Sequence, residues 1–175
     1  IRKKGQAVAA KRSDREAAEG CVLCKYENGF AAIIALKCET DFVAKNADFV
    51  KLAQDILDVA VANKCKTLDE VKALQLGDVT VAQAVVDRSG ITGEKMELDG
   101  YMMVEGAETV VYNHMNRNGL CTIVAFNKKV DEQIGKQVAM QIAAMNPIAI
   151  DEDGVSEDIK QKEIEVAIEK TKAEQ

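Results

Sequence analysis

Five cysteines and a single histidine are the side chains of this chain best suited to bind zinc, and the cysteines could also carry redox chemistry. Cys21 and Cys24 have the CxxC spacing of a redox disulfide or of one half of a zinc site. A zinc site would need a second such pair or two histidines. A thioredoxin-like motif should open a helix after a strand, whereas these cysteines fall within a predicted strand. We therefore predict reduced thiols on alternating faces of that strand, with no metal site.

A second distinctive group lies on a connector between two predicted elements and consists of Thr40, Asp41, Phe42 and Val43. The chain contains four phenylalanines and no tryptophan, so an aromatic ring beside an aspartate on a connector stands out. Leaving the ring in water is costly unless it folds back under its own helix, as in a hydrophobic staple, or is buried by a partner. The residues alone leave both interpretations open, and Thr40 suits turn geometry better than contact.

Regular elements are predicted on both sides of this connector. The strand before it, over residues 30–37, contains an apolar run without a breaker. The helix after it, over about residues 47–63, has apolar residues at helical spacing and is capped by Asn46. An Asn-Gly turn at residues 28–29 joins the first strand to another over residues 21–26, which predicts a β-hairpin.

The order of hairpin and helix occurs a second time. Strands over residues 110–115 and 120–126 precede a helix over about residues 131–145, which matches the first helix in apolar character. This second copy is four residues shorter between the hairpin turn and the helix. The missing residues correspond to positions 40–43, so only the first copy has the distinctive connector.

These patterns predict an α+β fold in which duplicated antiparallel β-hairpin plus helix units form two subdomains, followed by a C-terminal helix. Residues 96–105 are expected to add a strand to the second subdomain. The predicted segments are a basic linker helix (1–20), an N-terminal core subdomain (21–92), a C-terminal core subdomain (93–150) and the start of a helical coiled-coil or dimerisation segment (151–175).

Smaller features follow from local signals. We expect Pro147 to stop the second long helix, and Met140 and Met145 to fill the core. The acidic tail has one apolar stripe at helical spacing, with too few heptads to establish a coiled coil. Further helices are predicted over residues 7–18, ended by Gly20, over residues 68–74, and over residues 80–89, where Thr80 has capping-box spacing and Gly90 breaks the pattern.

Composition limits the classes of function. The net charge of −6 argues against general nucleic-acid binding through a basic surface. No run approaches the roughly 18 apolar residues that span a bilayer, and no secretory signal pattern opens the chain, so we expect a cytoplasmic protein. Residues 90–95 lack the spacing of a phosphate-binding loop, and no acid–histidine–nucleophile pattern is present. We expect no catalytic residues and no cofactor.

Residues 38–49, Cys-Glu-Thr-Asp-Phe-Val-Ala-Lys-Asn-Ala-Asp-Phe, resemble the signature of the elongation factor Ts family. Similarity runs through almost the whole chain, in residues 9–20, 93–95, 112–114, 117–119 and 138–147. Family members also have a three-helix ubiquitin-associated-like module before this region and a helical hairpin after it. The chain therefore resembles the core of the family without the N-terminal module and the C-terminal end.

The resemblance implies a guanine nucleotide exchange factor for elongation factor Tu, binding both its GDP-loaded and nucleotide-free forms. Thr40, Asp41, Phe42 and Val43 would then insert between two helices of the nucleotide domain and disturb the Mg²⁺ and phosphate site. His114 would belong to a second contact with a β-barrel domain of Tu. Lone histidines in turns are usually surface residues, so this role stays open.

The alternative is a ribosome- or nucleic-acid-associated binding module that uses the basic first segment. Residues 1–19 contain six basic and three acidic side chains, and they offer no aromatic platform for bases. Nucleic-acid binding should weaken steeply with salt, whereas a contact anchored by Phe42 should not. We expect no direct nucleic-acid or membrane partner. The resemblance leaves a homodimer open, and it does not separate a bacterial from an organellar origin.

Overall fold

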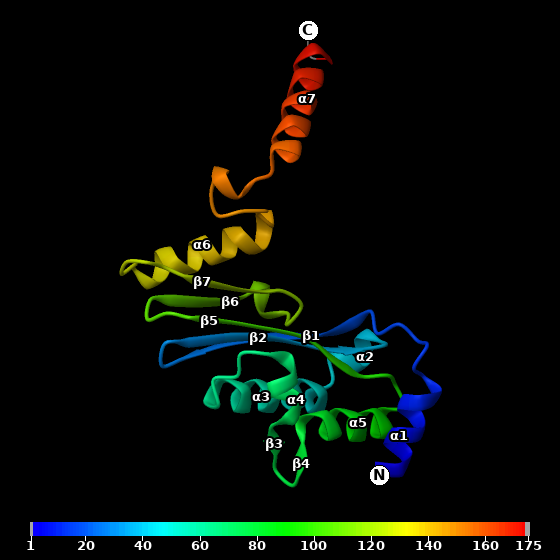
Figure 1. Ribbon diagram of the computed structural model, residues 1–175. Helices are drawn as coiled ribbons and strands as arrows, with labels where there is room; N and C mark the ends of the chain where they lie inside the picture. The colour runs from blue at the N-terminus through cyan, green and yellow to red at the C-terminus, as the bar shows by residue number, and fades with distance from the viewer. Residues whose placement is uncertain (1, 174–175) are drawn as a thin grey trace. The chain divides into compact units, whose positions relative to one another are not determined.

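The computed structural model describes residues 2–173 and divides into two compact parts, a larger part that ends at Ala143 and a C-terminal part that begins at Ala144. Position 1 of the predicted linker helix and positions 174–175 of the predicted C-terminal segment lie outside the described residues. The elements in chain order (Figure 1) are α1 (Arg2–Lys11), β1 (Glu19–Glu27), β2 (Phe30–Cys38), α2 (Asp41–Ala44), α3 (Ala47–Ala62), α4 (Leu68–Ala73), β3 (Gln75–Leu76), β4 (Val79–Thr80), α5 (Val81–Thr92), β5 (Glu97–Glu105), β6 (Thr109–Asn113), η1 (His114–Asn116), β7 (Cys121–Ala125), α6 (Glu132–Met145), η2 (Glu152–Gly154) and α7 (Glu157–Ala173). The α+β class is confirmed.

The first hairpin forms at the Asn-Gly turn, as predicted. β1 and β2 pair antiparallel over their full length. Asn28 and Gly29 adopt positive φ angles of 50° and 77°, which a two-residue turn of this kind needs and which asparagine and glycine tolerate best. Cys21 is buried and Cys24 is half-buried on β1, three residues apart and so on opposite faces. The predicted strand placement of both cysteines is confirmed.

β5 corrects the expected grouping of strands. The sequence assigns residues 96–105 to the second hairpin, but β5 pairs antiparallel with β2, with Ile34 opposite Tyr101. The sheet order is β1-β2-β5, and β6 and β7 form a separate two-stranded sheet. The apolar run of β2 predicts a buried strand with neighbours on both edges, but periodicity does not identify the second neighbour. As a division into subdomains, the boundary at residues 92–93 stays a prediction.

Helix α3 packs on one face of the three-stranded sheet and forms the main core with it (Figure 1). Alternate side chains of β2, from Phe30 to Cys38, belong to the same buried cluster. The helix contributes a stripe at spacings of three and four residues, as the sequence predicts. Its buried residues are Phe49, Ala53, Ile56, Leu57, Ala60 and Val61.

The second hairpin contacts the three-stranded sheet from the side away from α3 (Figure 1). The backbone N–H of Val22 on β1 donates to the carbonyl oxygen of Asn118, with a separation of 2.7 Å. Helix α6 lies over this hairpin and buries only Gly135 and Ala139. Thr122 Oγ1 donates to the carbonyl oxygen of Ala139 at 3.0 Å, which fastens the helix to β7.

Helix α1 is shorter than the sequence suggests. A helix over residues 7–18 is predicted, but α1 ends at Lys11, and Gly20 lies inside β1 rather than at a helix end. Ser13 Oγ donates to the carbonyl oxygen of Ala10 at 3.1 Å. Such local side-chain bonds compete with continuation of a helix, so the chain turns here.

Helix α5 begins as predicted and ends later. Thr80 Oγ1 accepts a hydrogen bond from the backbone N–H of Gln83, at 3.2 Å, so Thr80 is the N-cap. The helix continues through Gly90, where the sequence suggests a break. It ends at Gly93, whose φ of 77° lies in the left-handed region that glycine favours at helix ends.

Helices α1 and α5 cross at two glycines, which explains why Gly90 does not break α5. A Cβ atom added to Gly90 would lie 2.7 Å from Gly5 Cα. A Cβ atom added to Gly5 would lie 2.5 Å from the carbonyl oxygen of Val86. The two backbones therefore touch directly, and the absence of side chains allows it.

Helix α6 ends at Met145, two residues before Pro147, as predicted. Met140 and Met145 are exposed, so the prediction that they fill the core is wrong. Helix α7 is also confirmed, with its apolar residues exposed and none buried. Among the helices within residues 2–173, none has both the length and the apolar character to cross a membrane.

Candidate functional site

The connector between β2 and α3 contains the short helix α2, which the sequence analysis does not anticipate. Thr40 is the N-cap of α2, and its Oγ1 accepts a long hydrogen bond of 3.5 Å from the backbone N–H of Val43. Asn46 caps α3, because its Oδ1 accepts from the backbone N–H groups of Asp48 and Phe49, at 3.0 and 3.3 Å. Two caps in succession define the path of the connector.

Phe42 is the large apolar side chain that α2 presents to solvent. Its side chain is 84% exposed, so the ring does not fold back under its own helix. Val43 and Ala44 pack against the core instead. Phe42 therefore makes no contribution to the core, while its neighbours hold α2 against it.

Asp41 lies beside Phe42 on the same exposed turn. Its carboxylate pairs with Lys45 Nζ at 2.8 Å, and both side chains are solvent-accessible. The hydrogen bond from Lys45 lowers the pKa of Asp41 below its ordinary value. An exposed pair of this kind contributes little to stability. Asp41 is therefore ionised and available to exchange Lys45 for another hydrogen-bond donor.

Glu39 holds the start of the connector through hydrogen bonds of its carboxylate. Its carboxylate oxygens accept hydrogen bonds from Arg12 NH1 at 2.9 and 2.8 Å and from the backbone N–H of Lys95 at 2.6 Å. The side chain is 9% exposed. Burial by itself raises the pKa of Glu39, but the bonds from Lys95 and Arg12 outweigh it and hold the pKa below its ordinary value.

Two residues near the end of α5 also contact the connector, and sequence reasoning missed both. Glu94 accepts hydrogen bonds from residues 39 and 40. Arg88 NH2 lies 3.2 Å from the Asp48 carboxylate and donates to Asn46 Oδ1 at 3.1 Å. The only sequence signal for Glu94 is its place in the Gly-Glu-Lys stretch that resembles the elongation factor Ts family. Nothing in the sequence pattern indicates Arg88.

His114 begins the 3-10 helix η1 after β6 and is half-buried. Its Nδ1 lies 3.2 Å from Tyr112 Oη, and the two rings meet edge to face with their centroids 5.8 Å apart. The loop that follows is longer than the predicted turn, with positive φ angles at Met115, Asn116 and Asn118. His114 is therefore held by its neighbours, and its predicted contact with a partner stays a prediction.

The structure brings the loop after His114 close to α2. A hollow is lined on one side by Asp41, Ala44 and Lys45 and on the other by residues 117–119. His114 does not line it. The exposed turn of the first unit and the hairpin loop of the second unit thus face a common space, although they are far apart in the sequence.

The CxxC cysteines occupy two environments. Burial in the core raises the pKa of Cys21 to about 11. A hydrogen bond with Cys121, on β7, lowers the pKa of Cys24. All five cysteines are free thiols. Within residues 2–173 no cluster of three or more His, Cys, Asp or Glu side chains has the arrangement of a metal site.

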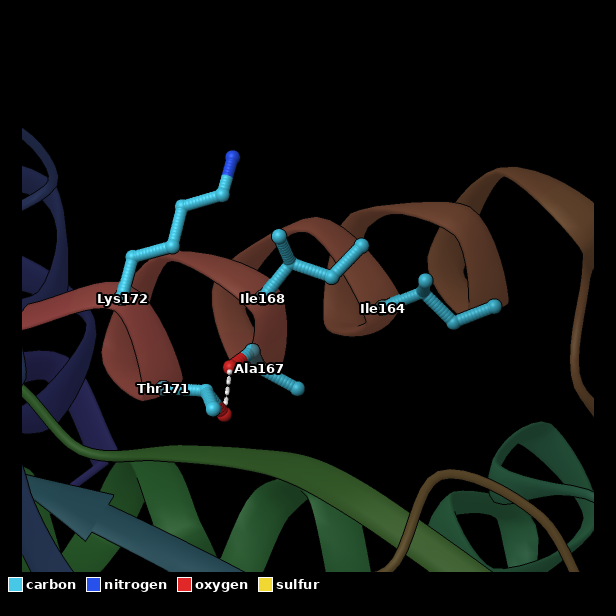
Figure 2. Close-up of a pocket in the computed structure, with 5 residues that line it drawn as sticks. All are labelled: Ile164, Ala167, Ile168, Thr171 and Lys172. Atoms are coloured by element: carbon cyan, nitrogen blue, oxygen red, sulfur yellow. Dashed lines mark hydrogen bonds between the residues drawn. The ribbon is translucent and has the colours of Figure 1, made fainter. Parts of the chain in front are cut away.

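An apolar strip lies along helix α7 in the C-terminal part of the chain. Figure 2 shows its five residues, Ile164, Ala167, Ile168, Thr171 and Lys172. Thr171 Oγ1 donates to the carbonyl oxygen of Ala167 at 2.9 Å, a bond within the helix. Because one helix supplies every lining residue, the strip is an open face and has no polar groups converging on a ligand.

Comparison with known proteins gives a consistent result. The sequence model of the family described as Elongation factor TS matches residues 39–175, beginning at the connector. Proteins named Elongation factor Ts from Bacteroides fragilis and Bacteroides thetaiotaomicron are each 82% identical over all 175 residues, which cover 53% of their own length. The protein of the same name from Porphyromonas gingivalis is 54% identical over 171 residues, 97% of this chain and 62% of the relative. The chain spans about half the length of the first of these relatives.

Proposed function

The chain belongs to the elongation factor Ts family, and on that premise we propose that it acts as a guanine nucleotide exchange factor for elongation factor Tu. The factor would bind the GDP-loaded form weakly and the nucleotide-free form tightly. By thermodynamic linkage, the factor and GDP would weaken each other's binding to the same extent. The activity would be one of binding, without covalent chemistry, during translation elongation in the cytoplasm.

The single observation that carries this proposal is the exposure of Phe42, whose neighbours Val43 and Ala44 pack against the core. An aromatic side chain that enters a cleft between two helices of a partner can act as a hot spot worth ~2 kcal/mol or more. Asp41 is next to it and can accept hydrogen bonds from donors in the cleft. Displacement of Mg²⁺ would leave the phosphates of GDP poorly neutralised, so GDP would leave faster.

The four connector residues would divide the work between them. Phe42 and Asp41 would contact elongation factor Tu, since both are exposed. Thr40 and Val43, as cap and core contact, would chiefly hold α2. His114 would extend the contact to a β-barrel domain of Tu.

The experiment is release of a fluorescent GDP analogue from elongation factor Tu at limiting concentrations of the chain. We expect acceleration by the wild type and about 30-fold less by Phe42→Ala, which corresponds to ~2 kcal/mol. Met102→Ala, which also removes an exposed apolar side chain, is the matched control and should behave as wild type. Equal rates for wild type and Phe42→Ala would refute the role of Phe42.

Two related points are tested in the same system. Binding of the chain to a nucleic acid that weakens steeply with salt, without acceleration of GDP release, would instead favour the alternative of a nucleic-acid-associated binding module. On family grounds we also propose a homodimer through α7. Sedimentation velocity of the wild type and of Ile168→Glu tests it. The substituted residue lies on the exposed strip of α7, so the variant should fold normally and be monomeric where the wild type is a dimer.

A further inference from the structure

Helix α2 cannot be stable by itself. It contains four residues, fewer than an isolated helix needs by a wide margin. Its internal bonds are one helical turn of backbone hydrogen bonds, from Ala44 to Thr40 and from Lys45 to Asp41, the long cap from Thr40 and the exposed pair between Asp41 and Lys45. A single turn does not fix the direction of Phe42, so the orientation of the ring depends on contacts from outside α2.

Val43 and Ala44 pack against the core, and Glu94 supplies the polar contacts at the residues just before α2. One carboxylate oxygen, Oε2, accepts from the backbone N–H groups of Glu39 and Thr40, each at 3.1 Å. The other, Oε1, accepts from Thr40 Oγ1 at 2.6 Å. Hydrogen bonds to an ionised acceptor are roughly twice as strong as neutral ones. All three donors lie immediately before Asp41, so Glu94 fixes the position from which α2 starts.

The position of Glu94 is itself fixed. Gly93 ends α5 in the left-handed conformation and turns the chain toward the connector. Thr92 Oγ1 accepts from the backbone N–H of Glu94 at 3.3 Å. The buried Ser89 donates through Oγ to the carbonyl oxygen of Glu94. The carboxylate is therefore presented from a rigid helix end rather than from a mobile loop.

Glu39 and Glu94 together form a reciprocal clasp. Residue 39 gives its backbone N–H to Glu94, and the carboxylate of Glu39 accepts the backbone N–H of Lys95 at 2.6 Å. Lys95 Nζ in turn donates to the carbonyl oxygens of Ser13 and Arg15, at 3.0 and 3.1 Å. The clasp joins three segments that are distant in the sequence and meet under α2.

We propose that Glu94 is a positioning residue that holds α2 so that the Phe42 ring is presented in one orientation to elongation factor Tu. This inference rests on the proposed exchange function. Glu94 does not contact the partner in this scheme. It acts by pre-organisation, since a ring fixed before binding loses less conformational freedom when it is buried.

A double-mutant cycle tests this. The variants are Glu94→Ala, Phe42→Ala and the pair, each assayed for GDP release from elongation factor Tu. We expect Glu94→Ala to reduce the acceleration by about tenfold, and to have almost no further effect when Phe42 is already alanine. Glu94→Gln retains one carbonyl acceptor and should recover part of the loss. Glu97→Ala, which removes a nearby exposed carboxylate, is the control for charge and should match wild type.

A loss that multiplies with the loss from Phe42→Ala would overturn the proposal, because Glu94 would then act independently of the ring. Wild-type activity in Glu94→Ala would overturn it as well. A general loss of folding is recognised by a lower thermal midpoint in all backgrounds and by amide exchange that accelerates throughout the first unit.

Amide hydrogen exchange separates failure of this inference from failure of the exchange function. In Glu94→Ala, exchange should accelerate in residues 39–46 and stay unchanged in α3, and this measurement needs no Tu. If the wild type does not accelerate GDP release, the proposed function fails, whereas the exchange result still decides whether Glu94 orders α2. Unchanged exchange in residues 39–46 would refute the positioning role.

Discussion

The two hairpin-and-helix units share one plan and differ at the connector. In the first unit residues 39–46 contain α2 and end at the cap Asn46, whereas in the second residues 126–131 contain no helix and end at Asp131. Asp131 Oδ1 accepts from the backbone N–H groups of Gln133 and Ile134, at 2.9 and 3.4 Å. The cap that starts the helix is thus kept in both units, while α2 with its exposed Phe42 is an addition to the first.

The helices also use equivalent positions in opposite ways. When Ala53 is aligned with Ala139, Phe49 of α3 corresponds to Gly135 of α6, and all four are buried. Phe49 fills the core, whereas a Cβ atom at Gly135 would lie 2.7 Å from Val110 Cγ2. The first helix places a large ring in the core, whereas the second has no room for a side chain at this point.

The helix of the first unit is therefore packed more extensively than the helix of the second. Helix α3 buries six residues and α6 buries two. Ile134, Val138 and Met140 remain exposed on α6. The unit that carries Phe42 therefore has the larger core, which agrees with the proposed role of Phe42 as a pre-organised contact.

The largest expected effect comes from removing the ring that distinguishes α3. Phe49→Ala should lower the free energy of unfolding by about 3–5 kcal/mol, because it deletes a fully buried aromatic side chain. Chemical denaturation followed by circular dichroism measures this. A loss below that of Val138→Ala, at a partly exposed position of α6, would show that the first core does not depend on Phe49.

A smaller effect is expected from filling the equivalent position of the second helix. Gly135→Ala should destabilise the protein by about 1–3 kcal/mol through overpacking against Val110, despite the higher helix propensity of alanine. The same denaturation assay applies. An increase in the free energy of unfolding would mean that α6 can move away from β6 without losing stability. A side chain at position 135 would then be tolerated, as it is at the equivalent position of α3.

The smallest expected effect is on the pH dependence of stability, and it concerns Glu39 in the connector of the first unit. The pKa of Glu39 is held below its ordinary value of 4.5, so its contribution is complete above that pH and is lost as the pH falls through the lowered pKa. Glu39→Gln should cost about 1 kcal/mol at neutral pH, and the difference from wild type should shrink below pH ~4.5.

Thermal unfolding of wild type and Glu39→Gln between pH 3 and pH 7 measures this dependence. Glu132→Gln is the control, because Glu132 begins α6 and pairs only with the exposed Lys136. A difference between Glu39→Gln and wild type that is independent of pH would contradict the ionised role of Glu39.

Local patterns predicted most elements because their causes are local. The Asn-Gly turn, the caps Asn46 and Thr80, and the stripe of α3 each depend on residues within a few positions of one another. The end of α1 was predicted too late because alanine-rich periodicity continues past Ser13, where a single side-chain bond stops the helix.

Longer-range relations were not predictable in the same way. β5 could pair with the open edge of β2 or with the second hairpin. Both are apolar, so the sequence pattern does not identify β2 as its partner. The contacts of Glu94 and Arg88 with the connector join positions more than 40 residues apart, and charged side chains at helix ends usually face solvent. The sequence pattern therefore indicates Phe42 and its neighbours in the chain, whereas only the structure shows that Glu94 and Arg88 hold the connector.

The crossing of α1 and α5 at Gly5 and Gly90 has an evolutionary consequence. Each glycine is needed because the other backbone occupies the space of its side chain, so a substitution at one cannot be compensated at the other. The two positions should therefore vary neither singly nor as a pair, unlike facing core residues, which exchange volume. Since α5 also carries Arg88 and leads to Glu94, a substitution in α1 at this crossing would, under our proposal, also disturb the orientation of Phe42.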